Sequence, residues 1–228
     1  MPDDLLPIAI AVAIMLLVGF PVHEFAHALA AYRLGDSTAK LFGRLTLNPI
    51  VHFDPLGGIL LAVTFLGSGG SFGFGWAKPT PVNPSNLAGG RRGEALVAAA
   101  GPLSNLILAA AAALPLRYLI ENPALWDSIP SAIFEVDSAG FIGGALPIFV
   151  TINLVLMIFN LIPIPPLDGS KVLFAFMPPR MAWQWRPVLE QYGFILLLLV
   201  FFIPPGASIG GRIITPILDG LFGLLVGI

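Results

Sequence analysis

The sequence predicts an all-α polytopic membrane protein, with about six membrane segments and a small β-sheet near the cytoplasmic face. Of its 228 residues, 57% are hydrophobic and only 11% are charged, whereas a soluble domain carries about 25% charged residues. The mean hydropathy is +0.90, and the apolar residues gather into long runs. Lipid must therefore cover much of the surface. The formal charge of −2 offers no basic surface, which excludes a nucleic-acid partner.

Six apolar runs are the candidate membrane segments, because a helix needs roughly 20 apolar residues to cross the ~30 Å hydrocarbon core. The second run has about half that length and is short enough to be re-entrant. Alternating apolar and polar residues, with Gly and Pro between them, predict short strands at 40–48 and 72–82. No interval is long enough for a second domain, so residues 1–228 are expected to form a single domain. The six runs are 5–32, 56–66, 95–116, 141–164, 188–203 and 213–228.

The basic residues predict the orientation in the membrane. Six of them lie between the first and third runs, and three more lie between the fourth and fifth runs. The interval 117–140 instead carries four acidic residues against one arginine. By the positive-inside rule the N-terminus and the acidic loop are extracytoplasmic, and the C-terminus is cytoplasmic. The start of the chain lacks the basic region of a cleavable signal, so the first run is expected to be retained. The basic residues are Arg33, Lys40, Arg44, Lys78, Arg91, Arg92, Lys171, Arg180 and Arg186.

An H-E-x-x-H pattern, His23-Glu24-Phe25-Ala26-His27, lies inside the first apolar run. On a helix the two histidines lie one turn apart on one side, so both imidazoles can reach one zinc ion. Glu24 can then accept a proton from a metal-bound water, whose pKa zinc lowers toward ~7. The alternatives are a chance match or a hydrogen-bonded histidine pair. Each charged group at the centre of a membrane costs at least ~2.5 kcal/mol, which disfavours a plain packing role.

A catalytic zinc needs a third protein ligand and one open position, and the candidates are His52 and the few acids at membrane depth. Among these acids Asp168 stands out, because it follows the fourth run in a proline-broken segment that cannot continue as a regular helix. Broken backbone at membrane depth is typical of a functional cavity. The alternative for Asp168 is a helix N-cap just past the membrane.

These segments resemble the site-2 protease family of intramembrane zinc metalloproteases. The similar patterns are H-E-F-A-H at 23–27 and N-x-x-P-x-P-P-L-D-G at 160–169, together with the segments 48–57, 75–83 and 100–105. They occur in the family's order and cover residues 19–175 or so of this chain. The chain is similar to the short branch of the family, which lacks a PDZ domain. Selection of substrates by a PDZ domain is therefore not expected.

The resemblance implies that His23, His27 and Asp168 hold one zinc ion per chain and that Glu24 is the general base. It also implies that the chain hydrolyses peptide bonds in or beside transmembrane segments of membrane-protein substrates. Such a substrate helix must first unwind locally, because its carbonyls are shielded by their own hydrogen bonds. The lipid bilayer is the expected surroundings, with the active site nearer the cytoplasmic face.

Three further polar residues have more than one interpretation. Asn160 can donate a hydrogen bond to the oxyanion of the tetrahedral intermediate, or it can cap broken backbone. His52 as a fourth ligand would close the zinc site, so a structural role or a place at a channel rim fits it better. Asn105 lies on a small-residue helix face with Gly101 and Ser104, which predicts helix packing.

Two other functions compete with proteolysis. A metal transporter could use His23, His27 and Asp168 as a transit site, but it does not need Glu24, and transporters usually contain internal repeats that this sequence lacks. A catalytically inactive membrane adaptor is disfavoured because every residue that the chemistry needs is present.

Overall fold

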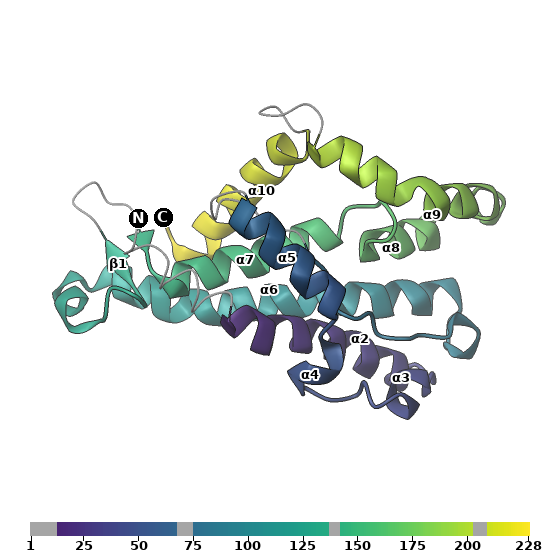
Figure 1. Ribbon diagram of the computed structural model, residues 1–228, viewed down its shortest axis with the longest axis horizontal. Helices are drawn as coiled ribbons and strands as arrows, with labels where there is room; N and C mark the ends of the chain where they lie inside the picture. The colour runs from purple at the N-terminus through teal and green to yellow at the C-terminus, as the bar shows by residue number, and fades with distance from the viewer. Residues whose placement is uncertain (1–12, 68–74, 137–141, 203–208) are drawn as a thin grey trace.

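Helix α6 (Arg91–Glu121) is the axis of the computed structural model, which describes residues 13–67, 75–136, 142–202 and 209–228. In Figure 1 it follows the long dimension of the molecule, with α2 (Phe20–Arg33) on one side and α7 (Ala145–Asn160) on the other. Its 31 residues correspond to a length of about 46 Å at 1.5 Å per residue. Within the described residues α6 is the one helix long and apolar enough to cross a membrane, while α7 is a shorter apolar helix.

Each of the six apolar runs contains a helix, although the bounds differ from those expected. The first run passes through a π-helical turn (Met15–Gly19) into α2, and its residues 5–12 lie outside the described part of the chain. The fourth run ends early because Pro163 and the prolines after it prevent α7 from continuing. The six-segment topology stays a prediction. The remaining helices are α3 (Thr38–Leu41), α4 (Pro49–His52), α5 (Pro55–Gly67), α8 (Asp168–Phe176), α9 (Pro179–Phe202) and α10 (Ile209–Val226).

The main apolar core lies between α6, α7 and α10. Ala109 and Ala113 of α6 are fully buried beside Val150 and Leu154 of α7, and Val226 of α10 joins the same cluster. Small side chains on α6 let the neighbouring backbones approach closely, as is typical of helix packing in membranes. This core fixes α7 alongside α6. It therefore also fixes where the chain emerges from α7 toward Asp168.

The predicted position of the β-sheet was wrong. The described residues contain a two-stranded antiparallel sheet, β1 (Glu135–Val136) with β2 (Ile142–Gly143). Strand β1 lies in the loop predicted to be extracytoplasmic, and β2 lies at the start of the fourth apolar run. Residues 40–48 instead contain the end of α3 and turns, with Gly43 at a positive φ of 70°. Residues 75–82 have no regular secondary structure, since their two prolines lack the N–H that a ladder needs; residues 72–74 lie outside the described part.

A buried carboxylate fastens the end of the 75–82 segment to α2. Asp36 lies three residues after the end of α2 and is fully buried. One of its oxygens accepts a hydrogen bond from the backbone N–H of Asn83 at 2.7 Å. The other oxygen accepts bonds from the Thr38 hydroxyl at 2.6 Å and the Asn86 amide at 3.1 Å. These hydrogen bonds satisfy the buried Asp36 carboxylate. They also hold the end of the 75–82 segment close to α2, the helix that carries the H-E-x-x-H pattern.

Candidate metal centre

Helix α2 presents both histidines of the H-E-x-x-H pattern on one side. The chain enters α2 through the π-helical turn, a local irregularity often found at functional sites, and Pro21 stands in the first turn. His23 and His27 are buried, with their Nε2 atoms 3.0 Å apart. The expected geometry of an i, i+4 histidine pair is therefore present.

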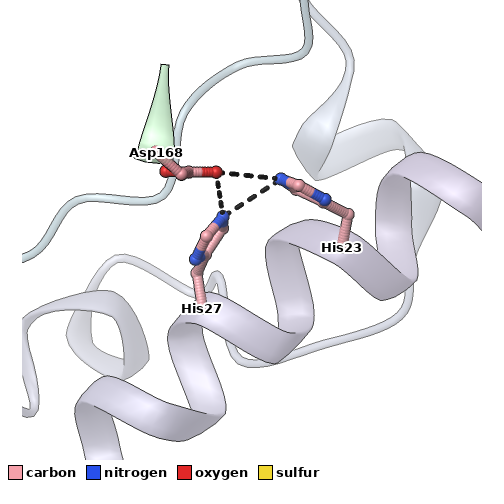
Figure 2. Close-up of side chains that lie close together, drawn as sticks. All are labelled: His23, His27 and Asp168. Carbon is pink, nitrogen blue, oxygen red and sulfur yellow. Dashed lines mark hydrogen bonds and ion pairs between the residues drawn. The ribbon is translucent and has the colours of Figure 1, made fainter. Parts of the chain in front are cut away.

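Asp168 meets the two histidines from a different helix. The proline-rich turns after α7 reverse the chain, and Asp168 is the first residue of α8. Its Oδ2 atom lies 3.4 Å from Nε2 of His23 and 3.1 Å from Nε2 of His27 (Figure 2). A Cβ atom on Gly169 would lie 2.2 Å from the carbonyl oxygen of Leu161. Glycine at this position is therefore what lets Asp168 fold back onto the end of α7.

Helix α6 contacts both imidazoles at their Nδ1 atoms, on the side of each ring away from Asp168. His27 Nδ1 bonds to the carbonyl oxygen of Val97 at 2.7 Å, and His23 Nδ1 bonds to the side-chain oxygen of Asn105 at 2.5 Å. Gly101 lies between these two residues, at the same i, i+4 spacing. A Cβ atom there would lie 2.3 Å from Nε2 of His27 and 2.7 Å from Cε1 of His23. One face of α6 thus supplies two acceptors and the space for two rings.

The donor set fits a zinc ion. The Val97 carbonyl can only accept a hydrogen bond, so the neutral His27 carries its proton on Nδ1 and leaves Nε2 bare. The same holds for His23 if Asn105 presents its oxygen. Two bare nitrogens and a carboxylate oxygen then converge within 3.0–3.4 Å, an arrangement that a cation between them would stabilise. Ligands of a tetrahedral zinc at about 2.0–2.2 Å stand roughly 3.3–3.6 Å apart, close to these spacings.

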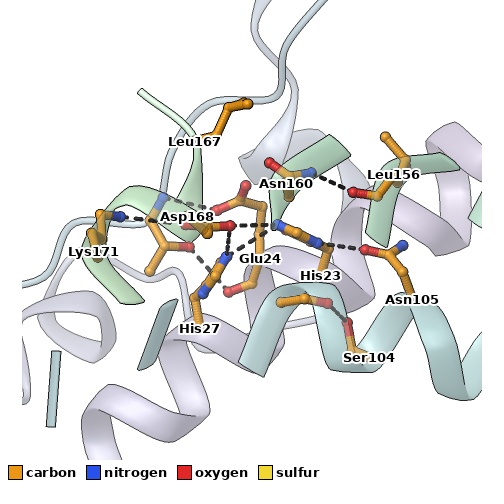
Figure 3. A network of polar contacts seen from close by, with 12 residues as sticks. His23, Glu24, His27, Ser104, Asn105, Leu156, Asn160, Leu167, Asp168 and Lys171 are labelled. Atoms are coloured by element: carbon orange, nitrogen blue, oxygen red, sulfur yellow. Dashed lines mark hydrogen bonds and ion pairs between the residues drawn. The ribbon is translucent and has the colours of Figure 1, made fainter. Parts of the chain in front are cut away.

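The remaining charged groups at the cluster have defined partners. Lys171 Nζ lies 3.4 Å from the other carboxylate oxygen of Asp168, which leaves Oδ2 for the histidines. Glu24 is buried, and its Oε2 accepts a hydrogen bond from the backbone N–H of Thr80 at 2.9 Å. The Thr80 hydroxyl donates to the backbone carbonyl of Glu24 at 3.1 Å. The 75–82 segment therefore orients the Glu24 carboxylate. Figure 3 shows Glu24 beside the side chains of His23, His27 and Asp168.

The other two candidates from the sequence lie outside this cluster of three ligands. Within the described residues the group able to hold a metal is His23, His27 and Asp168. His52 is buried, and its Nε2 donates to the carbonyl oxygen of Thr46 at 2.8 Å. Asn160, the last residue of α7, donates from its side chain to the carbonyl oxygen of Leu156 at 3.0 Å.

Sequence reasoning missed several residues that shape the site. The sequence predicts helix packing for Asn105, yet its side-chain oxygen also contacts His23 Nδ1. Asn153 was not singled out, although an amide inside an apolar run is costly and points to a specific partner. Thr80 offered no signal beyond its segment, because its contribution is a backbone N–H that any residue except proline provides.

Comparisons with known proteins show the family of the chain. The chain matches the family model described as "Peptidase family M50" over residues 10–136 and 130–200. It is 40% identical over 208 residues to "Putative zinc metalloprotease YwhC" of Bacillus subtilis (strain 168), covering 91% of this chain and 86% of that relative. It is 31% identical over 188 residues to "Putative zinc metalloprotease Rip2" of Mycobacterium tuberculosis (strain ATCC 25618 / H37Rv), covering 82% of this chain and 65% of the relative. No solved structure matches the chain.

Adding a side chain at Gly101 would test how closely α6 packs against the two histidines. In Gly101→Ala the new methyl group would overlap both imidazoles, so zinc affinity should fall by at least the ~10-fold typical of disturbed partners of metal-binding histidines. Competition with a chromophoric chelator in detergent measures this affinity. Gly220→Ala is the matched control, because a Cβ atom there meets nothing within 4 Å. Equal zinc affinity in the two variants would contradict the described packing.

Proposed function

The chain belongs to peptidase family M50 and is a membrane zinc metalloprotease, and we propose that it cuts peptide bonds in or beside transmembrane segments of other membrane proteins. The observation that carries this proposal is the convergence of His23, His27 and Asp168 beside the buried Glu24. Three protein ligands leave the fourth position of a tetrahedral zinc free for water or substrate. We expect one zinc ion per chain, because His23, His27 and Asp168 are the group in the described residues that could hold a metal.

Glu24 would perform the proton transfers. When bound at these three ligands, zinc supplies Lewis-acid chemistry, polarising the scissile carbonyl and lowering the pKa of water toward ~7. Glu24 takes a proton from the attacking water as the new C–O bond forms. It returns this proton to the amide nitrogen as the C–N bond breaks. The Thr80 N–H binds Oε2 and fixes the carboxylate rotamer, so that the second oxygen is free to receive the proton.

Asn160 is the proposed donor to the substrate's carbonyl oxygen. Its amide carries two N–H hydrogens, and the bond to Leu156 uses one of them. The other is available for the negative charge that develops on the carbonyl oxygen. The alternative role of Asn160 is to cap the end of α7, for which the Leu156 bond alone is sufficient.

The depth of the cluster along α6 supports cleavage within the membrane. Val97 and Asn105, which hold the two histidines, lie about 9 Å and 21 Å from the start of α6 at 1.5 Å per residue. Arg91 and Arg92 mark that end of the helix and, by the positive-inside rule, the cytoplasmic side. The cluster would therefore lie inside the hydrocarbon region, closer to the cytoplasmic face. A substrate helix reaching it must unwind to expose a carbonyl.

Replacing Glu24 separates a protease from a metal transporter. Glu24→Gln keeps the shape of the side chain but cannot shuttle a proton, and general acid–base catalysis contributes typically ~10²–10⁴-fold. Cleavage of a fluorescent transmembrane substrate should fall by at least that factor, while zinc content stays near one per chain. His23→Ala should lose both zinc and activity, and Glu121→Gln, at an exposed carboxylate, should change neither. If Glu24→Gln cleaved at the parental rate, the protease mechanism would be wrong.

Removing the Asn160 amide distinguishes its two roles. Asn160→Leu keeps the volume and removes the donor. An oxyanion donor contributes ~10²–10³ to kcat, so kcat should fall by about that much with zinc affinity and KM nearly unchanged. A loss of thermal stability with parental kcat would instead assign Asn160 to the end of α7 alone.

The proposed orientation in the membrane can be tested with reporter fusions. A fusion at Glu135 should report an extracytoplasmic position and a fusion at Arg91 a cytoplasmic one, because the basic residues cluster on the Arg91 side. Alkaline phosphatase and a fluorescent protein, active on opposite sides of the membrane, provide the two signals. The reverse pattern would overturn both the orientation and the proposed depth of the cluster.

A further inference from the structure

Two buried asparagines connect His23 to the backbone of a third helix. Asn105 of α6 and Asn153 of α7 are both fully buried. Asn153 Nδ2 donates to the carbonyl oxygen of Phe149 at 2.9 Å, and Asn105 Nδ2 donates to Oδ1 of Asn153 at 2.9 Å. Asn105 Oδ1 then lies 2.5 Å from His23 Nδ1. Three hydrogen bonds in series thus run from α7 through α6 to the candidate metal ligand on α2.

The bond between Asn153 and the Phe149 carbonyl fixes which group donates and which accepts in the other two hydrogen bonds. The Phe149 carbonyl can only accept, so Asn153 must turn its NH2 group toward it and its oxygen toward Asn105. That oxygen in turn requires the NH2 group of Asn105. Asn105 is left with its oxygen facing His23, which therefore carries its proton on Nδ1. Nε2 of His23 is then a bare nitrogen directed at Asp168 and His27.

We propose that Asn105 and Asn153 are positioning residues that hold His23 in the tautomer able to bind the metal. This inference rests on the zinc site of the proposed function. The second amide is needed because the first can turn over. An unrestrained Asn105 could present its NH2 group to Nδ1, which would move the proton to Nε2 and block the metal position. His27 needs no such restraint, since its partner is a backbone carbonyl already fixed within α6.

A role in helix packing alone predicts something different. Packing of α6 on α7 requires the bond between the two asparagines but not the contact of Asn105 with His23. Substitutions would then lower thermal stability and leave the zinc affinity of the folded protein unchanged. Zinc affinity, measured on the full chain in detergent at one pH, is therefore the readout that separates the two roles.

The test compares zinc affinities by competition with a chromophoric chelator. Asn105→Leu should weaken zinc binding by the ~10–100-fold typical of a lost partner of a ligating histidine. Asn105→Asp keeps an acceptor for His23 but loses the donor to Asn153 Oδ1. It should therefore weaken zinc binding less than Asn105→Leu does, because carboxylates serve as partners of ligating histidines in many zinc sites. Ser104→Ala is the matched control, since the hydroxyl of this buried neighbour donates to the carbonyl oxygen of Gly101 in its own helix. It should bind zinc like the parent.

The role of Asn153 is tested by a double-mutant cycle. Asn153→Leu alone should weaken zinc binding by about three- to tenfold, less than a residue bonded directly to the histidine. In the Asn105→Leu background it should have no further effect, because the series is already broken. Cobalt substitution gives a second readout, since its visible absorption should change in Asn105→Leu and stay parental in Asn105→Asp and Ser104→Ala.

Several results would overturn the proposal. These are parental zinc affinity in Asn105→Leu, equal losses in Asn105→Asp and Asn105→Leu, or the same effect of Asn153→Leu in both backgrounds. If Asn105→Leu does not fold, the zinc affinity of Asn153→Leu is the deciding measurement. A parental zinc affinity in Asn153→Leu would then reject the proposal. Failure of the proposed function is distinct: the parent would bind zinc with these dependences and yet cleave no transmembrane substrate.

Discussion

Two imidazoles of α2 are held at their Nδ1 atoms by acceptors on α6, and the rest of the site follows from this antiparallel contact. His27 pairs with the Val97 carbonyl and His23 with Asn105, so the rings are fixed at the edge that faces away from the metal position. Gly101 between the two acceptors brings α6 against both rings. A metal-binding histidine usually donates its second N–H to such an acceptor, which sets both the tautomer and the ring orientation.

The third ligand depends on how α7 packs. Alanines on α6 bring α7 close, and the prolines that follow end the helix and turn the chain back. Asp168 then enters the cluster as the first residue of α8, with Gly169 against the end of α7. Helix α7 also carries Asn153, which accepts a hydrogen bond from Asn105. The same helix therefore leads to the candidate ligand Asp168 and contacts the side chain that holds His23. We therefore expect metal affinity to depend on the packing of α7 against α6.

The proposed proton transfers by Glu24 depend on a separate segment of the chain. The 75–82 segment has no regular secondary structure, yet it is fastened at one end by Asp36 and at its centre by the paired contacts between Thr80 and Glu24. Polar backbone at membrane depth is tolerated only where protein or water satisfies it. These contacts meet that requirement and at the same time hold the Glu24 carboxylate in one orientation beside the cluster.

Local pattern was sufficient to predict the helical class, the i, i+4 histidine pair, and Asp168 as a candidate third ligand in a proline-broken segment. Each of these depends on residues a few positions apart or on the apolar content of a run, so the sequence by itself determines them. The tertiary structure decided which groups meet: Asn105 with His23, 82 residues apart, and Asn105 with Asn153, 48 residues apart. The sheet was predicted in the Gly- and Pro-rich segments, and in the tertiary structure it is formed by Glu135–Val136 and Ile142–Gly143. Strand pairing and hydrogen bonds between helices depend on packing across the fold, and no periodicity in the sequence encodes that packing.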